Sequence, residues 1–546
     1  MVIKNVLIEN FRGINHLELN LEQLTGIVGE NGVGKTSILD AINLALSPYY
    51  LSSRVDISDF NYESEGQFSI KIEFDQNFIA KLPDGWNSRE VPCIGVALVV
   101  KKRERATPGK AFSDGFTTSH YLIPDDSARK LTRNGDKWSM PRKGDDSRPF
   151  KFTYRHLRVS NAEDTELPKS FLFDKDRENQ SKIGFNSTLQ RLTDDFNWRF
   201  RKNIEEIEEP LIQVWDELYD LVMDNVGDAK LRETIRPLRN KLSKIISDEF
   251  EDLELSLLSL KEPFGKSFFS IRKGLHQIKR DELGSGISMF LTFLFLNVIS
   301  NLSNEQIIIM IDEPELHLHP QFQKRLFKFL SDEDNNQIIY TSHSENFIDI
   351  GQWRGIRRLD NNFEAHPKQK VLNQKLSYKG HEQTIEKHLN DLYKYYFDKS
   401  VITKEHNEIL FARKCLLVEG PIEKYAFDVL SNRFNYNFED LTIIKANGKE
   451  KLKNLQLICK AFGIPYFTVF DLDDKDNEDD ENKALKSFSG DSNYYAFPKT
   501  FEHVLGTQNA DRKTSESMSR IEELEELPKL LKEALDSIDE FIDTTK

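Results

Sequence analysis

A glycine-rich segment near the N-terminus has the residue types and spacing of a phosphate-binding loop. The run Gly29-Glu-Asn-Gly-Val-Gly34-Lys35-Thr36 lies between an expected strand and an expected helix, which is the context that this pattern requires. Backbone N–H groups at the start of the helix would surround the phosphates of ATP, Lys35 would reach the β- and γ-oxygens, and Thr36 would bind Mg²⁺. A chance glycine turn is the alternative. The predicted ATP contacts are Asn31, Gly32, Gly34, Lys35, Thr36 and Ser37.

Two acids that could act on ATP follow an apolar strand expected near residues 307–311. Asp312 could hold the Mg²⁺ through water, and Glu313 could orient or deprotonate the attacking water. An apolar strand that ends in two acids is common, and a solvated strand end would also explain it. The phosphate-binding loop in the same chain favours the functional interpretation. His343, at the end of the next expected strand, could sense the γ-phosphate, although a lone histidine is more often a surface residue.

A second set of acids lies near strand ends in the C-terminal part of the chain. Glu419 directly follows one expected strand, and Glu423 lies one helical turn further on, so both can face one ion. Asp471 and Asp473 end another expected strand and share a face. Hard oxygen ligands at the C-terminal edge of a parallel sheet suit Mg²⁺ or Mn²⁺, as phosphodiester chemistry requires. Alternatively, an acidic chain places carboxylates at strand ends without any role, and residues 471–480 form in part a solvated loop.

The elements that must position these residues alternate between strands and helices. Apolar alternation and helical spacing predict strands near residues 2–9, 16–20, 24–28, 67–75, 93–101, 253–260, 306–311 and 337–341, with helices near 35–46 and 286–299 and after residue 320. After a polar linker near 361–381 and a helical stretch near 385–397, we expect strands at 415–418, 441–446, 466–470 and 494–497 and helices from about 421 and 449. We also expect one Glu-rich amphipathic helix with a solvated face near 520–543. This alternation implies a parallel sheet and an α/β class.

Between residues 187 and 250 strand signals vanish, and the apolar residues follow helical spacing. Pro210 and Pro237 interrupt the stretch, and even an unbroken helix of about 64 residues would be shorter than about 100 Å. We therefore predict a helical insertion and not a long coiled-coil arm.

Length and charge limit the class of protein. The 546 residues suggest three or four domains at about 150 residues each. The net charge of −15 excludes a nucleic-acid coat protein that is basic over its whole surface. Residues 101–158 depart from this sign, with 15 Lys and Arg against 7 Asp and Glu, so a local DNA contact is possible, although such clusters are usually solvated loops. The candidate residues for this DNA contact are Lys101, Lys102, Arg103, Arg105, Arg129, Lys130, Arg133, Arg142 and Lys143.

Cysteine content and hydropathy predict a cytoplasmic protein without a membrane span. The three cysteines are widely separated and odd in number, which excludes a disulfide framework or a cysteine-based zinc site built from this chain alone. A reducing compartment fits best. The longest mostly apolar stretch, residues 287–299, is shorter than the roughly 20 residues that cross a bilayer.

Three further motifs carry a family resemblance in the N-terminal part. Leu283-Gly-Ser-Gly286-Ile-Ser288 resembles the signature loop of ABC-type ATPases, which implies that Ser285 and Gly286 contact ATP bound to a partner head. Asn10-Phe11-Arg12 and Glu313-Pro-Glu-Leu-His-Leu-His-Pro320 resemble the SMC/RecF-like branch, which implies a nucleotide contact for Arg12. The resemblance implies a homodimer, or a higher even oligomer, with two composite ATP sites.

The C-terminal acids resemble the Toprim fold of topoisomerases, primases and some nucleases. Thr500-Phe-Glu502 resembles the additional metal ligands of the nuclease branch. The resemblance implies that Glu419, Glu423 and Asp471 surround one ion, and that Asp473 and Glu502 surround the other. It also implies a basic residue farther on, for which Lys529 is our candidate. Two ions about 3.5–4 Å apart can activate a water and stabilise the leaving oxygen.

An ABC-type ATPase followed by a Toprim domain resembles the overcoming-lysogenisation-defect (OLD) nuclease family, which includes the nuclease subunit of the Gabija anti-phage system and retron-associated effectors. The resemblance covers about residues 1–505. It implies an α/β chain with an ABC ATPase head at 1–186 and 251–375, a helical dimerisation insertion at 187–250, and a Toprim nuclease domain at 376–546. The implied partners are DNA and, in some members, an accessory defence protein or the RNA/DNA of a retron.

The sequence thus predicts a divalent-metal-dependent DNA endonuclease regulated by an ATPase head, with ATP and Mg²⁺ or Mn²⁺ as cofactors. The alternative is a non-cleaving, ATP-gated DNA clamp or sensor that recruits a partner protein. Retention of so many mutually repelling acids counts against the clamp, because a non-catalytic site has no physical need for them. A topoisomerase is disfavoured because no candidate domain carries the nucleophilic tyrosine it needs.

Overall fold

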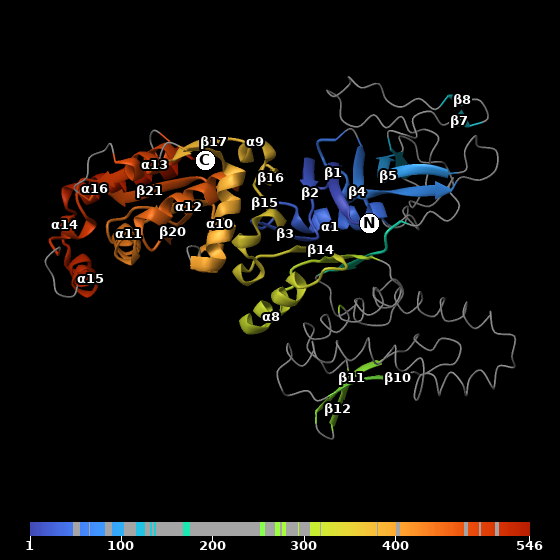
Figure 1. Ribbon diagram of the computed structural model, residues 1–546, viewed down its shortest axis with the longest axis horizontal. Coiled ribbons are helices and arrows are strands. Elements are labelled where there is room, and N and C mark those ends of the chain that lie inside the picture. The colour runs from blue at the N-terminus through green and yellow to red at the C-terminus, as the bar shows by residue number, and fades with distance from the viewer. Residues whose placement is uncertain are drawn as a thin grey trace. The chain divides into compact units, whose positions relative to one another are not determined.

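The computed structural model of the chain divides into two compact units (Figure 1). The first comprises Met1–Ile27 and Asn31–Phe347, and the second comprises Val28–Glu30 and Ile348–Lys546. The described residues are 1–46, 55–64, 66–81, 90–102, 116–125, 132–133, 136–137, 167–174, 252–256, 268–273, 276–279, 293, 306–316, 318–378, 381–399, 404–473, 479–490, 493–507 and 513–545. The predicted insertion at 187–250, Ser285, Gly286 and most of the basic candidates for DNA contact lie outside these residues.

The first unit contains an antiparallel sheet with the strand order β2-β1-β4-β5-β6. Its strands are β1 (Ile3–Phe11), β2 (Ile14–Asn20), β4 (Gln67–Lys81), β5 (Glu90–Lys102) and β6 (Phe116–Pro124). In β2 the apolar side chains of Ile14, Leu17 and Leu19 are buried, and the polar residues between them are exposed. This alternation shows that one face of the sheet packs against the core.

A parallel sheet in the same unit positions the predicted ATP residues. It contains, in order, β3 (Leu24–Gly29), β14 (Gln337–Thr341), β13 (Ile308–Ile311) and β9 (Ser170–Phe173). Every residue of β13 and β14 is buried, as expected for strands covered on both faces. Helix α1 (Lys35–Leu46) follows β3, and α8 (Pro320–Ser331) follows β13. Because the strands are parallel, the segments that follow β3, β13 and β14 begin at the same edge.

The remaining described elements of the first unit are short. They are η1 (Ile57–Asp59), η6 (Glu345–Phe347), the paired strands β7 (Thr132–Arg133) and β8 (Asp136–Lys137), and the antiparallel strands β10 (Asp252–Ser256), β11 (Phe268–Lys273) and β12 (His276–Lys279). The strand expected at 253–260 corresponds to β10.

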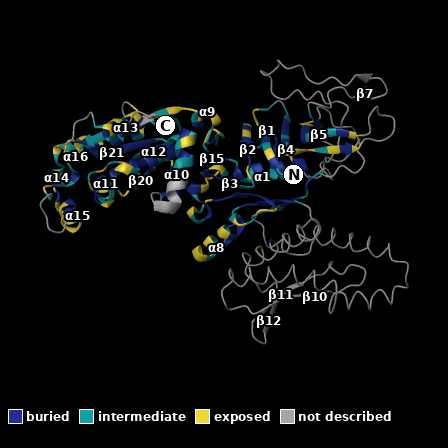
Figure 2. Cartoon of the chain, in the orientation of Figure 1, coloured by how far each residue is buried: buried dark blue, intermediate teal, exposed yellow. Residues whose placement is uncertain are grey.

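The second unit is built on a parallel sheet with the order β20-β19-β21-β22. Its strands are β19 (Lys414–Val418), β20 (Leu441–Lys445), β21 (Tyr466–Asp471) and β22 (Tyr494–Phe497). Neighbouring residues of one strand enter opposite cores: Leu417 belongs to one buried cluster and Leu416 to the other. The sheet is therefore covered on both faces, and Figure 2 shows its strands mostly buried.

Each face of this sheet has its own set of helices. The cluster around Leu417 contains Leu389, Leu455 and Leu485, contributed by α10 (Ile385–Lys399), α12 (Lys449–Ala461) and α13 (Asp480–Ser489). The cluster around Leu416 is completed by α11 (Pro421–Arg433), α14 (Phe501–Leu505), α15 (Lys513–Glu523) and α16 (Lys529–Thr544). Such a doubly covered parallel sheet is the α/β arrangement that the alternating pattern predicted.

Two expectations in the second unit were wrong. The expected polar linker at 361–381 instead contains β16 (Ala365–His366), α9 (Gln369–Leu372) and β17 (Lys375–Tyr378), because polar side chains close a turn after β15 (Ile356–Leu359). The single amphipathic helix expected at 520–543 is two helices, α15 and α16, separated at Pro528, and the apolar face of α16 buries Leu535 and Ile538 in the core.

Other features of the second unit complete its description. Its remaining elements are η7 (Ile350–Gly355), η8 (Lys404–Phe411) and β18 (His381–Thr384), which pairs with β17. The two units divide between Phe347 and Ile348, whereas the sequence suggested a boundary after residue 375. Among the described helices, none is both long and apolar enough to span a bilayer.

Candidate functional site

The phosphate-binding loop lies between β3 and α1, as predicted. Gly32 and Gly34 have φ values of +85° and +86°, a region that side chains other than glycine rarely adopt. Helix α1 begins at Lys35, whose residue is only 5% exposed. Ile38 donates its backbone N–H to the Gly34 carbonyl at 3.0 Å, so the helix starts directly from the loop. The N-terminal N–H groups of such a helix can bind phosphate.

Thr36 and Asp312, which sequence analysis paired at one Mg²⁺, lie in direct contact. The Thr36 hydroxyl oxygen is 3.0 Å from Asp312 Oδ2 and 3.2 Å from Oδ1. The hydroxyl of Thr341, at the end of β14, donates to Asp312 Oδ1 at 2.5 Å and accepts the Glu313 N–H at 3.0 Å. Asp312 is 1% exposed, so these hydroxyl groups replace water around a buried carboxylate. No pattern in the sequence indicated a role for Thr341.

Glu313 and His343 also meet at this edge. Glu313 has a φ of +48°, and its Oε1 lies 3.7 Å from His343 Nε2. The backbone N–H of His343 donates to Glu315 Oε1 at 2.5 Å, and the Ser342 hydroxyl donates to the same oxygen at 3.0 Å. Burial raises the pKa of Glu315. Glu315 therefore holds the loop that carries His343, a role that its place in Glu313-Pro-Glu315 did not reveal.

Arg12 is positioned by two acids. Its Nη1 lies 2.5 Å from Asp40 Oδ2 on α1, and its Nε lies 2.9 Å from Asp59 Oδ1. Arg12 itself has a φ of +51°. The structure thus ties Arg12 to the helix that follows the phosphate-binding loop, and its direct contact with nucleotide remains a prediction.

The second candidate site lies at the C-terminal edge of the β19–β21 sheet. Glu419 follows β19, Glu423 is in the first turn of α11, and Asp471 ends β21. The Asp471 N–H lies 3.5 Å from Glu419 Oε2, and the Phe501 N–H at the start of α14 donates to Asp471 Oδ2 at 2.9 Å. Two strands and two helices thus bring these acids together.

The electrostatics of the site follow from burial and like charge. Burial, and then repulsion from Glu419, Glu423 and Asp473, raises the pKa of Asp471 to about 8. Burial, and then repulsion from Glu423 and Asp473, raises the pKa of Glu419 to about 7. Burial likewise raises the pKa of Glu423, and the charge of Glu502 adds to this effect. A divalent cation would offset this repulsion, so the donor set fits such an ion.

Among the described residues, the Toprim acids are neighbours, but no three of their ligand atoms lie within 4.8 Å of one another. A different group of the described residues meets that criterion: Asp360, Glu364 and His366 each offer a ligand atom, and these three atoms lie within 4.8 Å of one another. Asp473, the other acid expected at this edge, has a φ of +57°, and its Oδ2 lies 2.8 Å from Lys449 Nζ. The Toprim acids therefore share one edge, with their ligand atoms farther apart than in that group.

The lysine that contacts these acids is Lys449. It is the first residue of α12, is 8% exposed, and also donates to the Asp471 carbonyl oxygen. Lys529, our sequence candidate, starts α16 with an 89% exposed side chain whose ammonium lies 3.7 Å from Glu533 Oε1. The one sequence signal for Lys449 was its position directly after a glycine, at the start of a helix that follows β20.

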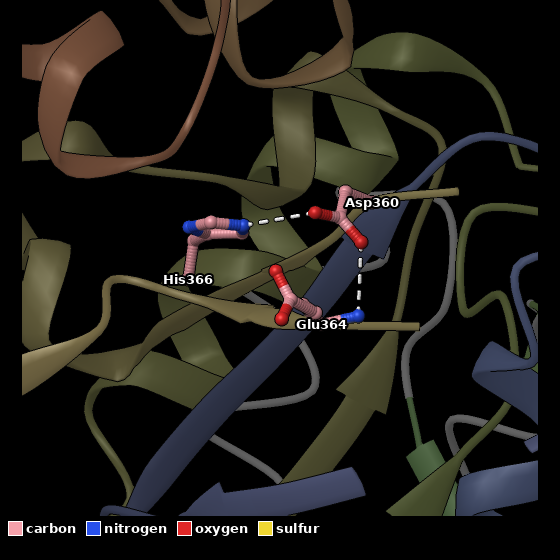
Figure 3. A group of neighbouring side chains, drawn as sticks. All are labelled: Asp360, Glu364 and His366. Atoms are coloured by element: carbon pink, nitrogen blue, oxygen red, sulfur yellow. Dashed lines mark hydrogen bonds and ion pairs between the residues drawn. The ribbon is translucent and has the colours of Figure 1, made fainter. Parts of the chain in front are cut away.

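The group of Asp360, Glu364 and His366 closes the turn between β15 and β16 (Figure 3). Asp360 Oδ1 accepts the N–H groups of Asn362 and Glu364, both at 2.9 Å, and Oδ2 lies 3.1 Å from His366 Nε2. Glu364 forms an ion pair with Lys368. Because the Asp360 carboxylate is engaged within the turn and Glu364 pairs with Lys368, we assign the group a structural role.

The N-terminal part of the chain has a phosphate-binding loop beside a buried strand that ends in Asp-Glu. The C-terminal part has a parallel sheet with acids at its C-terminal edge. Together these features define an ATPase fused to a Toprim domain. Residues 1–348 match the AAA ATPase domain family, and residues 410–473 match the TOPRIM domain of overcoming lysogenization defect protein-like proteins. The chain belongs to this AAA ATPase family and carries an OLD-like TOPRIM domain. The predicted family and fold class are confirmed, and the two domains imply use of a nucleotide and a divalent metal.

Similar proteins span both domains. The chain is 24% identical to the OLD nuclease of Thermus scotoductus over 557 residues, covering 96% of this chain and 94% of that protein. It is 21% identical to endonuclease GajA of Bacillus cereus over 462 residues, covering 80% of this chain and 69% of the relative. A solved structure of the Smc head bound to the C-winged helix domain of ScpA matches with a TM-score of 0.41 and 14% identity, covering 71% of this chain and 99% of that one.

Proposed function

We propose that this chain is a nucleotide-regulated, divalent-metal-dependent DNA endonuclease. The observation that carries the proposal is the meeting of Glu419, Glu423 and Asp471 at one sheet edge, where burial and repulsion from neighbouring acids raise the pKa of each. A cluster in which several acids share one lysine is costly unless a further cation binds to it. The similarity to proteins named OLD nuclease and endonuclease GajA supports the same activity.

In the Toprim domain, Glu419, Glu423 and Asp471 would hold one divalent ion, and Asp473 and Glu502 the other. When bound, the ions would supply an activated water and charge stabilisation for the leaving oxygen. The Phe501 N–H, which donates to Asp471 Oδ2, fixes the orientation of that carboxylate. Buried apolar neighbours on both faces of the sheet keep the edge rigid, so that the acids are held in place before DNA arrives.

In the ATPase domain, Lys35 would bind the phosphates, and Thr36 and Asp312 would hold Mg²⁺. Glu313 would orient the attacking water, and His343, whose Nε2 lies 3.7 Å from Glu313 Oε1, would sense the γ-phosphate. Ser285 and Gly286 of a second copy would complete the site, and Arg12 would contact nucleotide from beside α1. These assignments make ATP turnover the regulator of cleavage.

The biological setting of this activity also belongs to the proposal. We place the protein in the cytoplasm, in anti-phage defence, as a homodimer or higher even oligomer formed through residues 187–250. An accessory defence protein or the RNA/DNA of a retron would act as a partner. Static light scattering of a chain lacking 187–250 tests the dimer: monomers are expected, and a persisting dimer would place the contact elsewhere.

The decisive experiment compares cleavage by the purified wild type and Asp471→Asn. Plasmid and linear DNA are incubated with Mg²⁺ or Mn²⁺, with and without ATP. Loss of a direct ligand should lower cleavage by at least about 100-fold and leave ATP hydrolysis unchanged. Asp428→Asn, an exposed position on α11, is the matched control and should cut like the wild type. Undiminished cutting by Asp471→Asn contradicts the proposal, and wild-type DNA binding without cutting favours the clamp.

A further inference from the structure

Lys449 is a buried cation among the Toprim acids. Its side chain is 8% exposed, its Nζ lies 2.8 Å from Asp473 Oδ2, and it donates a second hydrogen bond to the carbonyl oxygen of Asp471. Its charge also acts on Glu419, where it partly offsets the effects of burial and of the neighbouring acids on the pKa. One ammonium group therefore serves several residues proposed as metal ligands.

Helix stability does not explain a lysine at this position. Lys449 is the first residue of α12, where the helix dipole disfavours a positive charge. The preceding residues, Asn447 and Gly448, have φ values of +56° and +130°, and the Gly448 N–H donates to the Glu419 carbonyl at 3.0 Å. A loop with two residues at positive φ thus fixes Lys449 relative to the backbone of Glu419. The neighbouring carboxylates offset the desolvation cost of burying the Lys449 ammonium.

Asp473 is turned toward this ammonium by its own backbone. Its φ of +57° is uncommon for a residue other than glycine, and its side chain is 37% exposed. Under the proposed function, Asp473 also serves the second divalent ion. An ammonium 2.8 Å from the carboxylate would lie close to that ion, and two adjacent cations repel each other.

We propose that Lys449 is a positioning residue: a built-in cation that holds Asp473 in the metal-free protein and competes with the second divalent ion. The inference rests on the proposed function. The competition by Lys449 would give the two ions different affinities. The ion held by Glu419, Glu423 and Asp471 binds first, and the ion that needs Asp473 binds more weakly because the ammonium must first release that carboxylate.

Titration calorimetry with Mn²⁺ in the absence of DNA tests this proposal. The Toprim domain of the wild type should bind two ions with different dissociation constants. Lys449→Met should tighten the weaker site by about tenfold or more, because the competing charge is gone. In EDTA the same variant should unfold at a lower temperature than the wild type, and Mn²⁺ should raise its melting temperature by more. Lys451→Met, two residues further along α12, is the control and should bind Mn²⁺ and unfold as the wild type does.

Two further variants separate charge from packing and cover a failure of Lys449→Met to fold. Lys449→Arg keeps the charge and should leave the weaker site weak, whereas Lys449→Gln keeps a donor without charge and should tighten it. Equal affinities in the wild type, or weaker Mn²⁺ binding by Lys449→Gln, would overturn the role of Lys449 while the nuclease proposal stands. No Mn²⁺ binding by the wild type would overturn both.

Discussion

The hydroxyl of Thr341 donates a hydrogen bond to Asp312 at 2.5 Å and connects the end of β14 to the end of β13. The same hydroxyl accepts the N–H of Glu313. One uncharged side chain on a neighbouring strand thus orients the proposed magnesium ligand and fixes the backbone of the proposed water-orienting acid.

Replacing this hydroxyl should slow ATP hydrolysis without preventing ATP binding. Thr341→Val keeps the volume and removes the support of Asp312, so we expect kcat to fall by roughly 10- to 100-fold. Steady-state ATPase assays and fluorescent-nucleotide titrations measure the two effects. Thr25→Val, a buried threonine of the adjacent strand β3, is the control and should keep its activity. Full activity of Thr341→Val would mean that Asp312 needs no such support.

Lys35 should be essential for nucleotide affinity. Lys35→Ala removes the side chain expected to reach the β- and γ-phosphates, and a fluorescent ATP analogue should no longer bind at micromolar concentration. Lys324→Ala, at an exposed position of α8, should bind as the wild type does. Unchanged nucleotide affinity of Lys35→Ala would refute our placement of the phosphate-binding loop.

Glu313 should separate ATP binding from ATP turnover. Glu313→Gln keeps the size of the side chain and removes the carboxylate that orients the water, so bound ATP should persist while hydrolysis falls by at least about 100-fold. DNA cleavage by this variant, measured with ATP, with ADP and without nucleotide, should differ from the wild-type pattern. Identical cleavage in all three states would contradict regulation by the nucleotide.

Glu315 should act on hydrolysis through the loop that carries His343. Glu315→Ala removes the acceptor for the His343 N–H and the Ser342 hydroxyl, and a displaced loop should lower kcat by roughly 10- to 100-fold with little change in KM. Glu315→Gln retains an acceptor and should recover most of the activity. An equal loss in both variants would show that the negative charge, and not the hydrogen bonding, is required.

His120 should make the first unit less stable in acid. Burial in β6 lowers its pKa to about 4, whereas an exposed histidine titrates near 6.5. Between these values the unfolded chain binds a proton that the folded chain does not. The free energy of unfolding therefore falls as the pH drops below about 6.5, by about 2 kcal/mol at pH 5.

The melting temperatures at pH 7.5 and pH 5 test this prediction. His120→Gln should lose part of the difference between the two pH values, whereas His503→Gln, at an exposed position of α14, should keep it. If both variants respond to pH as the wild type does, protonation of His120 carries no cost for folding.

Local patterns were sufficient to predict many of the residues that meet at both candidate sites. The phosphate-binding loop is continuous in sequence, and its glycines mark the positive φ values that the structure contains. Asp312, Glu419 and Asp471 could be found because each acid follows an apolar strand, and parallel strands end at one edge. The same reasoning needs no knowledge of distant contacts.

Interactions between distant segments were not predictable in this way. Lys449 and Asp473 are 24 residues apart, and their contact depends on left-handed backbone at Asn447 and Asp473, which no residue pattern announced. Arg358, just before the segment expected to be a linker, donates to the carbonyl oxygens of Leu410, Ala412 and Phe462. Leu372, within that segment, is buried in the same core.

Gly420 has no side chain to compete with Glu423. A Cβ atom added there would lie 3.0 Å from Glu423 Oε2, a contact that a swing of the flexible carboxylate would relieve. An alanine at this position would therefore leave expression, solubility and melting behaviour almost intact while moving one ligand of the acidic edge. A search for this acidic edge in other sequences should therefore require the glycine as well as the carboxylates.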